Sequence, residues 1–434
     1  MGIFFGTDGI RGVMNEDLTC ELATTCGNAL ARMKPRGTIL VGRDTRLSGS
    51  CLTSALAVGA MKAGSNIIDV GIIPTAGIAY LTKKYKASWG VVISASHNPA
   101  QCNGIKVFDS EGKKITEDVE NAIEKHFASS QVVSAADIGS FIYKPSLSKE
   151  YTQSLVYAIS HKLEGMRIVL DASNGASYKI APYIFRTLGA TVYTTSCKNN
   201  GAKINDNCGA LYIDALRKQV LAHHADLGFA YDGDADRLQI IGPDGSLYDG
   251  DHIVYMLTCM YIQKRWLKAR TVVGTSQTNS AFVQALRKKH VSFLRTDVGD
   301  KYVMEAMDQH HLQIGGEQSG HVILSDFATT GDGILASLFI ASFVKTSKKS
   351  LKELLAFSLF PQAHRNILVQ DKLRVVNNEM LAQRIEQFHK QIPQGRILVR
   401  ASGTEPKVRI MVECKDQTTA ENIADALALC VKQL

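Results

Sequence analysis

The run Gly90-Val91-Val92-Ile93-Ser94-Ala95-Ser96-His97-Asn98-Pro99 decides how the fold of this chain is interpreted. Its first four residues are apolar and mostly β-branched, which is typical of a short buried strand. Small and polar residues followed by Asn-Pro must leave such a strand abruptly. We therefore expect Ser96 on a loop at the carboxyl end of a strand, where open α/β sheets place their ligands. On these residues alone, an ordinary strand exit with two incidental serines is the simpler alternative.

Length and composition describe an ordinary globular chain of several domains. Its 434 residues exceed what one hydrophobic core usually organises, so at ~150 residues per domain three or four domains are expected. With 45% hydrophobic and 21% charged residues, a soluble protein is predicted. The net charge is +8, but basic residues are scattered, which is typical of solvated faces rather than of a nucleic-acid footprint. An acidic small molecule is the simpler explanation for the excess.

The sequence gives no sign of export or of a membrane span. Residues 1–12 lack a basic region followed by an apolar core, and no apolar run approaches the ~20 residues of a membrane helix. The nine cysteines include no Cys-x-x-Cys, and an odd number in a long chain indicates reduced thiols. A cytoplasmic location is expected.

Short β-branched runs alternate with longer helical patterns, which predicts α/β units built largely on parallel strands. Three times a strand runs into a polar loop and a helix, and later in the same segment a second polar loop runs into a short hairpin. The second loops begin at Ser96, Asp232 and Glu317, and their hairpin turns are expected at 109–112, 243–245 and 325–330. Three similar domains, each with one polar loop, are the economical inference, although α/β domains look alike at this level.

The end of the chain differs from the rest. Two strands, 396–400 and 407–413, flank a Gly-containing turn, and a helical pattern runs from Thr418 to Leu434, which indicates a smaller α+β domain. A Leu-rich helix from Leu351 is expected to end at Phe360. The predicted fold class is α/β, with three similar mixed-sheet α/β domains and a smaller C-terminal α+β domain. The predicted domains are 1–145, 146–252, 253–360 and 361–434.

The second polar loop has the composition of a metal site. In Asp232-Gly233-Asp234-Ala235-Asp236 three carboxylates alternate with the two smallest residues, so all three can point one way. Two like charges at ~4 Å repel by about 4 kcal/mol at an effective dielectric near 20, so the cluster favours a cation. An all-oxygen site without His or Cys suits Mg²⁺ before Ca²⁺. A solvated acidic turn is the alternative.

Two further segments have the composition of ligand sites. The hairpin from Arg400 to Arg409 carries two arginines, two hydroxyls and a Gly, and guanidinium forks with backbone N–H groups bind phosphate monoesters well. An ordinary hairpin with surface charges is the alternative. In the third loop, Glu317, Ser319 and His321 place donors and acceptors at alternate positions, which suits neighbouring hydroxyls of a sugar.

Phosphoryl transfer would draw on the loop at Ser96 and on the acidic loop together. A serine oxygen can carry a phosphoryl group, Mg²⁺ can neutralise the charge on its oxygens, and a lysine can move the proton of the acceptor hydroxyl. Lys106 is the local candidate, although a lone lysine is more often a solvated side chain.

Six motifs in order along the chain carry a family resemblance. They are Gly6 to Gly12, Ser94 to Pro99, Asn103 to Lys106, Asp232 to Arg237, Gly316 to His321 and Arg400 to Pro406. Together they resemble the α-D-phosphohexomutase superfamily. The opening Phe-Gly-Thr-Asp-Gly-Ile-Arg-Gly and the Glu-Gln-Ser-Gly-His form of the third loop are most similar to its phosphoglucosamine mutase branch.

The resemblance implies four domains around a central cleft and a set of site residues. Ser96 would be a phosphoserine, and Mg²⁺ would be held by that phosphate with Asp232, Asp234 and Asp236. Lys106 would transfer the proton, with Arg11 and His97 close by, while Glu317, Ser319 and His321 would bind the sugar. The residues implied to hold the non-reacting phosphate are Arg400, Ser402, Gly403, Thr404 and Arg409.

The implied reaction is the reversible conversion of glucosamine 6-phosphate to glucosamine 1-phosphate through a bisphosphate that reorients. It would supply amino-sugar nucleotide and cell-wall precursor synthesis, with a sugar 1,6-bisphosphate as activator. The partner would be a small phosphosugar, with no nucleic acid or membrane, and a homodimer is left open. A phosphoglucomutase or phosphomannomutase, a silent sugar-phosphate sensor and a metal-dependent phosphatase are the alternatives.

Three positions depart from the pattern of the family. Cys102 stands where an Asp is usual, Ala210-Leu211-Tyr212 replace a Ser-Thr-His run, and Lys301 replaces an Arg. The last change exchanges a guanidinium fork for a point charge. Substrate preference is therefore less firmly predicted than reaction class.

Overall fold

The computed structural model describes residues 4–6, 8–128, 134–355, 357–402 and 406–434. The chain divides into two compact units. The large unit comprises Met1–Gln277 with Ser292–Leu354, and the small unit comprises Thr278–Val291 with Leu355–Leu434.

The first sheet of the large unit has seven strands in the order β1-β2-β6-β5-β3-β4-β7. Strands β5, β3, β4 and β7 are parallel, whereas β1, β2, β6 and β5 pair antiparallel. The elements are β1 (Phe5–Gly6), β2 (Gly9–Val13), α1 (Cys20–Met33), β3 (Thr38–Arg43), α2 (Gly49–Lys62), β4 (Asn66–Ile72), α3 (Thr75–Tyr85), β5 (Trp89–Ile93), β6 (Cys102–Phe108), α4 (Glu117–Ala128) and β7 (Phe141–Tyr143).

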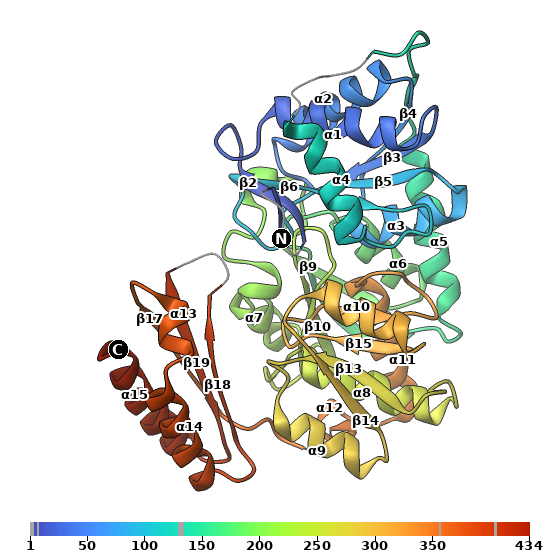
Figure 1. Ribbon diagram of the computed structural model, residues 1–434. Coiled ribbons are helices and arrows are strands. Elements are labelled where there is room, and N and C mark those ends of the chain that lie inside the picture. Colours follow the sequence, from blue (N-terminus) through green and yellow to red (C-terminus); the bar gives the residue numbers. More distant parts are fainter. Residues whose placement is uncertain (1–3, 7, 129–133, 356, 403–405) are drawn as a thin grey trace. The chain divides into compact units, whose positions relative to one another are not determined.

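Strand β5 is buried throughout because helices cover both faces of the sheet (Figure 1). Val91 and Ile93 belong to the hydrophobic core that also contains residues of α1, α2 and α4. The alternate residue Gly90 lies against α3, where an added Cβ would approach Thr82 Oγ1 to 2.2 Å. Successive residues of β5 face opposite sides of the sheet, and both sides are buried. The sequence of the strand is therefore a continuous β-branched run without alternating polar residues.

Two further sheets repeat the combination of parallel strands with an antiparallel edge. The second has the order β12-β11-β10-β8-β9 and the third the order β14-β13-β15-β16. Their elements are η1 (Pro145–Leu147), α5 (Ser148–Ala158), β8 (Arg167–Asp171), α6 (Ile180–Thr187), β9 (Thr191–Thr195), η2 (Gly201–Lys203), η3 (Gly209–Leu211), α7 (Asp214–Ala222), β10 (Leu227–Tyr231), β11 (Leu238–Ile241), β12 (Leu247–Tyr248), α8 (Gly250–Gln263), β13 (Thr271–Thr275), β14 (Ser292–Thr296), α10 (Asp300–Gln309), β15 (Ile314–Gly316), β16 (Val322–Leu324), α11 (Gly333–Ser347) and α12 (Leu351–Leu354).

The small unit is built on an antiparallel sheet of order β17-β19-β18. Its elements are α9 (Ser280–Lys288), β17 (Gln362–Leu368), α13 (Lys372–Val376), α14 (Glu379–Gln391), β18 (Arg396–Ala401), β19 (Lys407–Glu413) and α15 (Gln417–Lys432). One side of the sheet shares a hydrophobic core with α14 and α15. Helix α9 joins this unit because the Ser280 N–H donates to Glu413 Oε1 at 2.9 Å.

The predicted fold class is confirmed, with three mixed-sheet α/β domains and a smaller C-terminal α+β domain. The domain boundaries remain predictions. Each polar loop connects two antiparallel strands (β5 to β6, β10 to β11, β15 to β16), a pairing that the sequence did not predict.

The expected hairpins are present only in part. The one at 243–245 forms between β11 and β12, whereas a single bridge between Phe108 and Lys114 closes the turn at 109–112. The third prediction was wrong, because Asp332 caps α11 through the Leu335 N–H where a return strand was expected. The helix from Leu351 was also predicted too long, because α12 ends at Leu354 and the described residues 352–355 and 357–360 are not buried.

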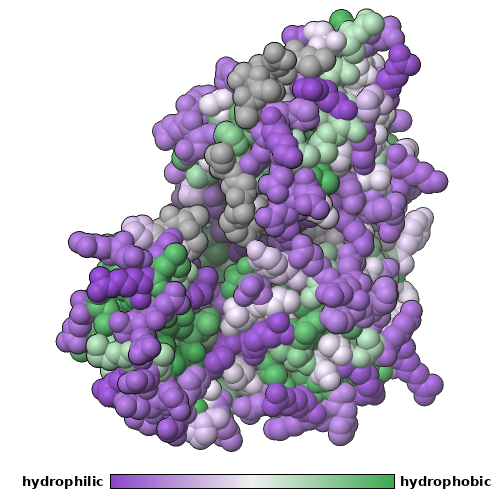
Figure 2. Space-filling view, viewed as in Figure 1, coloured by the Kyte–Doolittle hydropathy of each residue, from purple (hydrophilic) through white to green (hydrophobic). Residues whose placement is uncertain are grey.

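Hydrophilic side chains predominate on the face of the molecule drawn in Figure 2, with smaller hydrophobic patches between them. Among the described residues, none of the helices combines the length and apolar character that crossing a membrane requires.

Candidate active site

Three loops of the large unit converge, each the connection between two antiparallel strands. The β5–β6 loop carries Ser96, the β10–β11 loop carries the three aspartates, and the β15–β16 loop carries Glu317. A backbone bridge between Arg237 and His321 joins the second loop to the third. Because each loop leaves the same end of a parallel strand pair, three separate domains contribute to one site.

Ser96 is held in a strained conformation at the centre of this site. Its φ of 52° lies in the left-handed region, which a residue with a Cβ adopts only when its surroundings require it. The Ser96 carbonyl accepts from Arg46 Nη2 at 3.0 Å and from Asn205 Nδ2 at 2.8 Å. The buried Oγ donates to Asp232 Oδ2 at 2.5 Å and lies 3.4 Å from Asp236 Oδ1.

Arg46 is the clamp that fixes the Ser96 loop. Besides Ser96, its guanidinium donates to the carbonyls of Asn98 at 2.8 Å, Cys102 at 2.8 Å and Pro99. Its Nε pairs with Asp44 Oδ2 at 2.9 Å, and both side chains are fully buried. Five N–H donors in a rigid fork can satisfy several carbonyls at once, so Arg46 sets the path of the loop.

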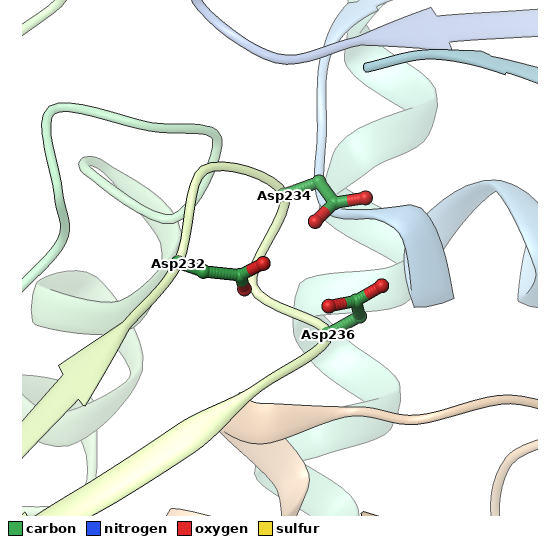
Figure 3. Close-up of side chains that lie close together, drawn as sticks. All are labelled: Asp232, Asp234 and Asp236. Carbon is green, nitrogen blue, oxygen red and sulfur yellow. The ribbon is translucent and has the colours of Figure 1, made fainter. Parts of the chain in front are cut away.

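The three aspartates form a buried cluster in which the carboxylates point toward one another (Figure 3). One oxygen of each lies within 4.8 Å of one oxygen of the others. Burial, together with Asp236 and Asp234, raises the pKa of Asp232 well above its usual range. Asp234 Oδ1 is buried and has no hydrogen-bond partner among the described residues, and such an orphaned acceptor is costly. These oxygens fit a hard divalent cation.

Lys106 is buried against the same cluster, with 1% of its surface exposed. Its Nζ donates to Asp234 Oδ2 at 2.8 Å and to Asp236 Oδ2 at 2.9 Å, and it lies 3.1 Å from Asp8 Oδ2. Burial alone would lower the pKa of Lys106, but the three carboxylates raise it well above the ordinary value. Lys106 is therefore charged here, and it uses the Oδ2 atoms while leaving Asp234 Oδ1 available.

A closed ring of charged and titratable groups extends from the cluster. Its members, in order, are Asp236, Lys106, Asp8, Lys114, Asp300 and His321. Lys114 bridges Asp8 of the first domain and Asp300 at the start of α10. Burial alone would raise the pKa of Asp8, but Lys106, Lys114 and Arg11 lower it far below its usual range.

His321, the last residue of the third loop, completes this ring of charged groups. Its Nδ1 lies 3.9 Å from Asp236 Oδ2 and its Nε2 3.5 Å from Asp300 Oδ2. The Nε2 accepts from the Gly331 N–H at 3.2 Å, and an added Cβ on Gly331 would strike the ring. Burial alone would lower the pKa of His321, but Asp236 and Asp300 raise it.

Arg11 contacts the Ser96 loop at Asn98, and His97 contacts Ser96 itself. Arg11 pairs with Asp8 and lies 3.4 Å from Asn98 Oδ1, while His97 Nδ1 lies 3.4 Å from Ser96 Oγ. Burial and the positive charges of Arg237 and Arg11 lower the pKa of His97 to about 3. His97 is thus a neutral imidazole at physiological pH in this structure.

The two other residues of the third loop have different surroundings. Glu317 Oε1 accepts from the Gly299 N–H at 3.1 Å, and burial raises the pKa of its carboxyl. Ser319 Oγ is buried without a hydrogen-bond partner among the described residues.

The small unit contains the predicted phosphate hairpin. Arg400 and Arg409 are direct partners on β18 and β19, and burial together with Arg409 lowers the pKa of Arg400. Like charges opposite each other in a sheet are destabilising unless an anion compensates them. The Ser402 N–H donates to the Lys407 carbonyl at 2.8 Å, and the Ser402 carbonyl accepts from Lys372 Nζ at 2.6 Å. Gly403 and Thr404, also predicted here, lie outside the described residues.

The three departures from the family pattern occupy distinct places. Cys102 begins β6 and contributes its carbonyl to the Arg46 clamp. Lys301 Nζ pairs with Glu120 Oε2 of α4 at 3.1 Å. Leu211 and Tyr212, in and after η3, are each about half exposed at 51% and 50%.

Sequence reasoning missed the residues that support the site. They are Asp8, Asp44, Arg46, Lys114, Asn205 and Asp300. Asp44 and Arg46 gave a usable signal, since they directly follow a buried strand. Asp8 and Lys114 are 106 residues apart, and Lys114 and Asp300 are 186 apart, so no local pattern joins them.

The comparisons with known proteins agree with this fold and site. Four phosphoglucomutase/phosphomannomutase profiles match, namely α/β/α domain I at residues 2–133, domain II at 149–245, domain III at 249–360 and the C-terminal domain at 366–429. A phosphoglucomutase/phosphomannomutase family protein of Burkholderia thailandensis has the same fold at a TM-score of 0.83 and 23% identity, covering 99% of this chain and 97% of that one. These matches define a phosphohexomutase.

Curated relatives narrow the assignment. A phosphoglucosamine mutase of Clostridioides difficile is 40% identical over an alignment of 442 positions that covers 99% of this chain and 99% of its own. One from a Thermoanaerobacter species is 42% identical over 448 residues, covering 100% of this chain and 99% of its own. The chain belongs to the phosphoglucosamine mutase family of the α-D-phosphohexomutase superfamily.

Proposed function

We propose that this chain interconverts glucosamine 6-phosphate and glucosamine 1-phosphate, with Ser96 as the phosphoryl carrier. The observation that carries the proposal is the position of Ser96 Oγ, 2.5 Å from Asp232 Oδ2 on a loop held in left-handed conformation. In the first half-reaction the bond between phosphorus and Ser96 Oγ breaks while one forms to a sugar hydroxyl oxygen. The resulting bisphosphate reorients and returns its other phosphoryl group to Ser96.

Mg²⁺ is the proposed cofactor, held by Asp232, Asp234 and Asp236 with the phosphate on Ser96. The orphaned Oδ1 of Asp234 and the three converging carboxylates support this assignment. When bound, the ion would neutralise charge on the phosphoryl oxygens and on the carboxylates beside Lys106. A sugar 1,6-bisphosphate is proposed as activator because it can phosphorylate Ser96 at the start.

Lys106 is proposed to take the proton of the attacking sugar hydroxyl. Its pKa is raised by Asp234, Asp236 and Asp8, so it holds its proton firmly. Neutralisation of those carboxylates would lower the pKa of Lys106 toward the range in which an amine can accept a proton. Arg11 supplies a guanidinium beside the Ser96 loop, and neutral His97 can accept or donate a hydrogen bond at Ser96 Oγ.

Binding of the substrate is assigned to the two remaining polar segments. Glu317, Ser319 and His321 are proposed to bind the sugar. The ring of His321 also contacts Asp236 and Asp300, so its orientation is linked to the acidic loop. Arg400, Ser402, Gly403, Thr404 and Arg409 are proposed to hold the phosphate that does not react. The product would enter amino-sugar nucleotide synthesis in the cytoplasm, and a homodimer remains a prediction.

Replacement of Ser96 by Ala tests the carrier. We expect Ser96→Ala to lose the interconversion of the two glucosamine phosphates and to lose the phosphate that peptide mass spectrometry finds at position 96. The exposed Ser50→Ala on α2 is the matched control and should keep both. Turnover by Ser96→Ala would refute Ser96 as the carrier. Release of inorganic phosphate by the wild type at the rate of turnover would indicate a phosphatase.

Substrate choice is tested by kcat/KM on the phosphates of glucosamine, glucose and mannose. The highest value is expected for glucosamine phosphate. A higher value for glucose or mannose phosphate would place the activity with the phosphoglucomutases or phosphomannomutases while leaving the carrier unchanged.

A further inference from the structure

Two cysteines outside the active site lie in direct contact. Cys20 is the first residue of α1 and Cys51 the third residue of α2, and their Sγ atoms are 3.2 Å apart. Cys51 is exposed and Cys20 is partly exposed, whereas Cys26, two turns along α1, is buried. The nine cysteines all lie among the described residues, and none of them is in a disulfide.

The packing of α1 on α2 holds this pair in place. Asn28 Nδ2 donates to the Gly59 carbonyl at 3.0 Å, and the two residues are 31 apart in sequence, the same separation as Cys20 and Cys51. The helices therefore run side by side in one direction, with matching contacts ~12 Å apart along each axis. They lie together in Figure 1 as well.

The helices cannot separate or slide easily at this contact. A Cβ on Gly59 would lie 1.8 Å from the Thr24 carbonyl oxygen, and one on Gly27 would lie 2.0 Å from the Leu56 carbonyl oxygen. Because both backbones approach this closely, the two sulfurs are presented to each other by a rigid helix pair.

We infer that Cys20 and Cys51 are a reversible dithiol site that a small-molecule disulfide, such as oxidised glutathione, converts to an intramolecular disulfide. The exposed Cys51 thiolate attacks one sulfur of the small disulfide, and a thiolate leaves. The Cys20 thiolate then attacks Cys51 Sγ, and the second thiolate leaves. Two protein thiols are oxidised, the small disulfide is reduced to two thiols, and these take the two protons.

Cys51 attacks first because it is the more exposed of the two thiols and because the hydrogen bond between the two sulfurs holds a proton at Cys20. The hydrogen bond with Cys51, together with burial, raises the pKa of Cys20. Cys51, at the start of α2 and open to solvent, is the accessible nucleophile. This inference does not depend on the proposed function, since neither sulfur belongs to the active site.

The test uses the reduced full-length chain, treated with oxidised glutathione under native conditions and analysed by peptide mass spectrometry. We expect one cross-linked peptide pair containing Cys20 and Cys51, lacking two hydrogens, which dithiothreitol restores. Cys20→Ser is expected to stop at a glutathione adduct on Cys51. Cys430→Ser, which removes a partly exposed thiol from the small unit, should still form the cross-link.

Several outcomes would overturn the inference. The first is unreacted thiols at both positions, and the second is stable glutathione adducts on both without a cross-linked peptide. A third is protection of both thiols until a chelator removes a bound metal ion. Cross-links among the buried cysteines, accompanied by loss of the circular dichroism signal, would show that the pair reacts only on unfolding and would refute it equally.

Discussion

Replacement of Lys106 by Met separates the structural from the chemical role of a buried cation of the site. The change removes an ammonium that lies 2.8, 2.9 and 3.1 Å from oxygens of Asp234, Asp236 and Asp8. At an effective dielectric of 20 each of these contacts is worth roughly 5–6 kcal/mol before desolvation. Because desolvation cancels most of that, and breaking a buried pair leaves an uncompensated charge, we expect a net loss of about 3–5 kcal/mol of stability.

Added Mg²⁺ should rescue stability but not activity in Lys106→Met. Methionine leaves Asp234 and Asp236 without the ammonium, so a divalent cation bound by the aspartate cluster at one hundred times its dissociation constant should restore about 2.7 kcal/mol. Loss of the proton-transfer group should still lower kcat by about 100-fold or more. Urea unfolding with and without Mg²⁺ and steady-state kinetics give the two readouts.

The matched control is Lys113→Met, which breaks an exposed ion pair with Asp308. It should cost no more than about 1 kcal/mol and leave kcat unchanged. The reasoning fails if Lys106→Met is as stable as the wild type without metal, or if Mg²⁺ restores its turnover along with its stability.

Three further variants test other parts of the structure. Burial raises the pKa of Asp332 from 3.8 to about 6, so the folded chain binds that proton more tightly and stability falls by about 3 kcal/mol as pH rises from about 4 to 7. Asp332→Asn should therefore be the more stable protein at pH 7.5 and equal to wild type near pH 4, and equal urea midpoints at pH 7.5 would contradict this. Gly59→Ala should lower the unfolding temperature, because the new Cβ would lie 1.8 Å from the Thr24 carbonyl oxygen. Overpacking of this kind costs about 1–3 kcal/mol, more than the ~1 kcal/mol gained in helix propensity. An unchanged melting curve would show that the helices move apart to accommodate the methyl group. Arg400→Gln should raise KM for the phosphosugar at least ~10-fold, because the guanidinium that would bind the phosphate is lost. The unliganded chain should be no less stable, because the repulsion between Arg400 and Arg409 is removed. An unchanged KM would show that the hairpin does not bind the phosphate.

The parts of the site that the sequence predicts are those with a local cause. Ser96 directly follows a buried strand, and small residues separate Asp232, Asp234 and Asp236. Neighbouring residues alone therefore predict the strand exit and the common direction of the carboxylates. Short strands were harder to place. Strands β15 and β16 have three residues each, too few for a two-residue alternation to be recognised, and their pairing across the third loop went unseen.

The supporting residues could not be found in this way because their cause lies in tertiary structure. Lys114 has no unusual neighbours in sequence, and its burial follows only when α10 brings Asp300 to it and β2 brings Asp8. His321 was predicted to face a sugar, and nothing in Glu317 to His321 indicates that its ring reaches beneath the loop to Asp236 and Asp300.

The pKa values of the titratable groups around Ser96 are shifted in opposite directions, so neighbouring groups of one site hold different protonation states. Asp232 has a raised pKa and faces the Ser96 hydroxyl, while Asp236 beside Lys106 has a pKa well below its usual range. Neutral His97 adds no positive charge next to the serine. A positive charge placed among the aspartates would lower the pKa of Asp232 and of Lys106 together, because Asp234 and Asp236 contribute to the raised pKa of both groups, alongside the burial that raises the pKa of Asp232. Under the proposed function, one binding event would therefore favour the carboxylate of Asp232 that holds the cation and would bring Lys106 closer to accepting a proton from the sugar, so we expect the lysine and the acidic loop to act as a pair.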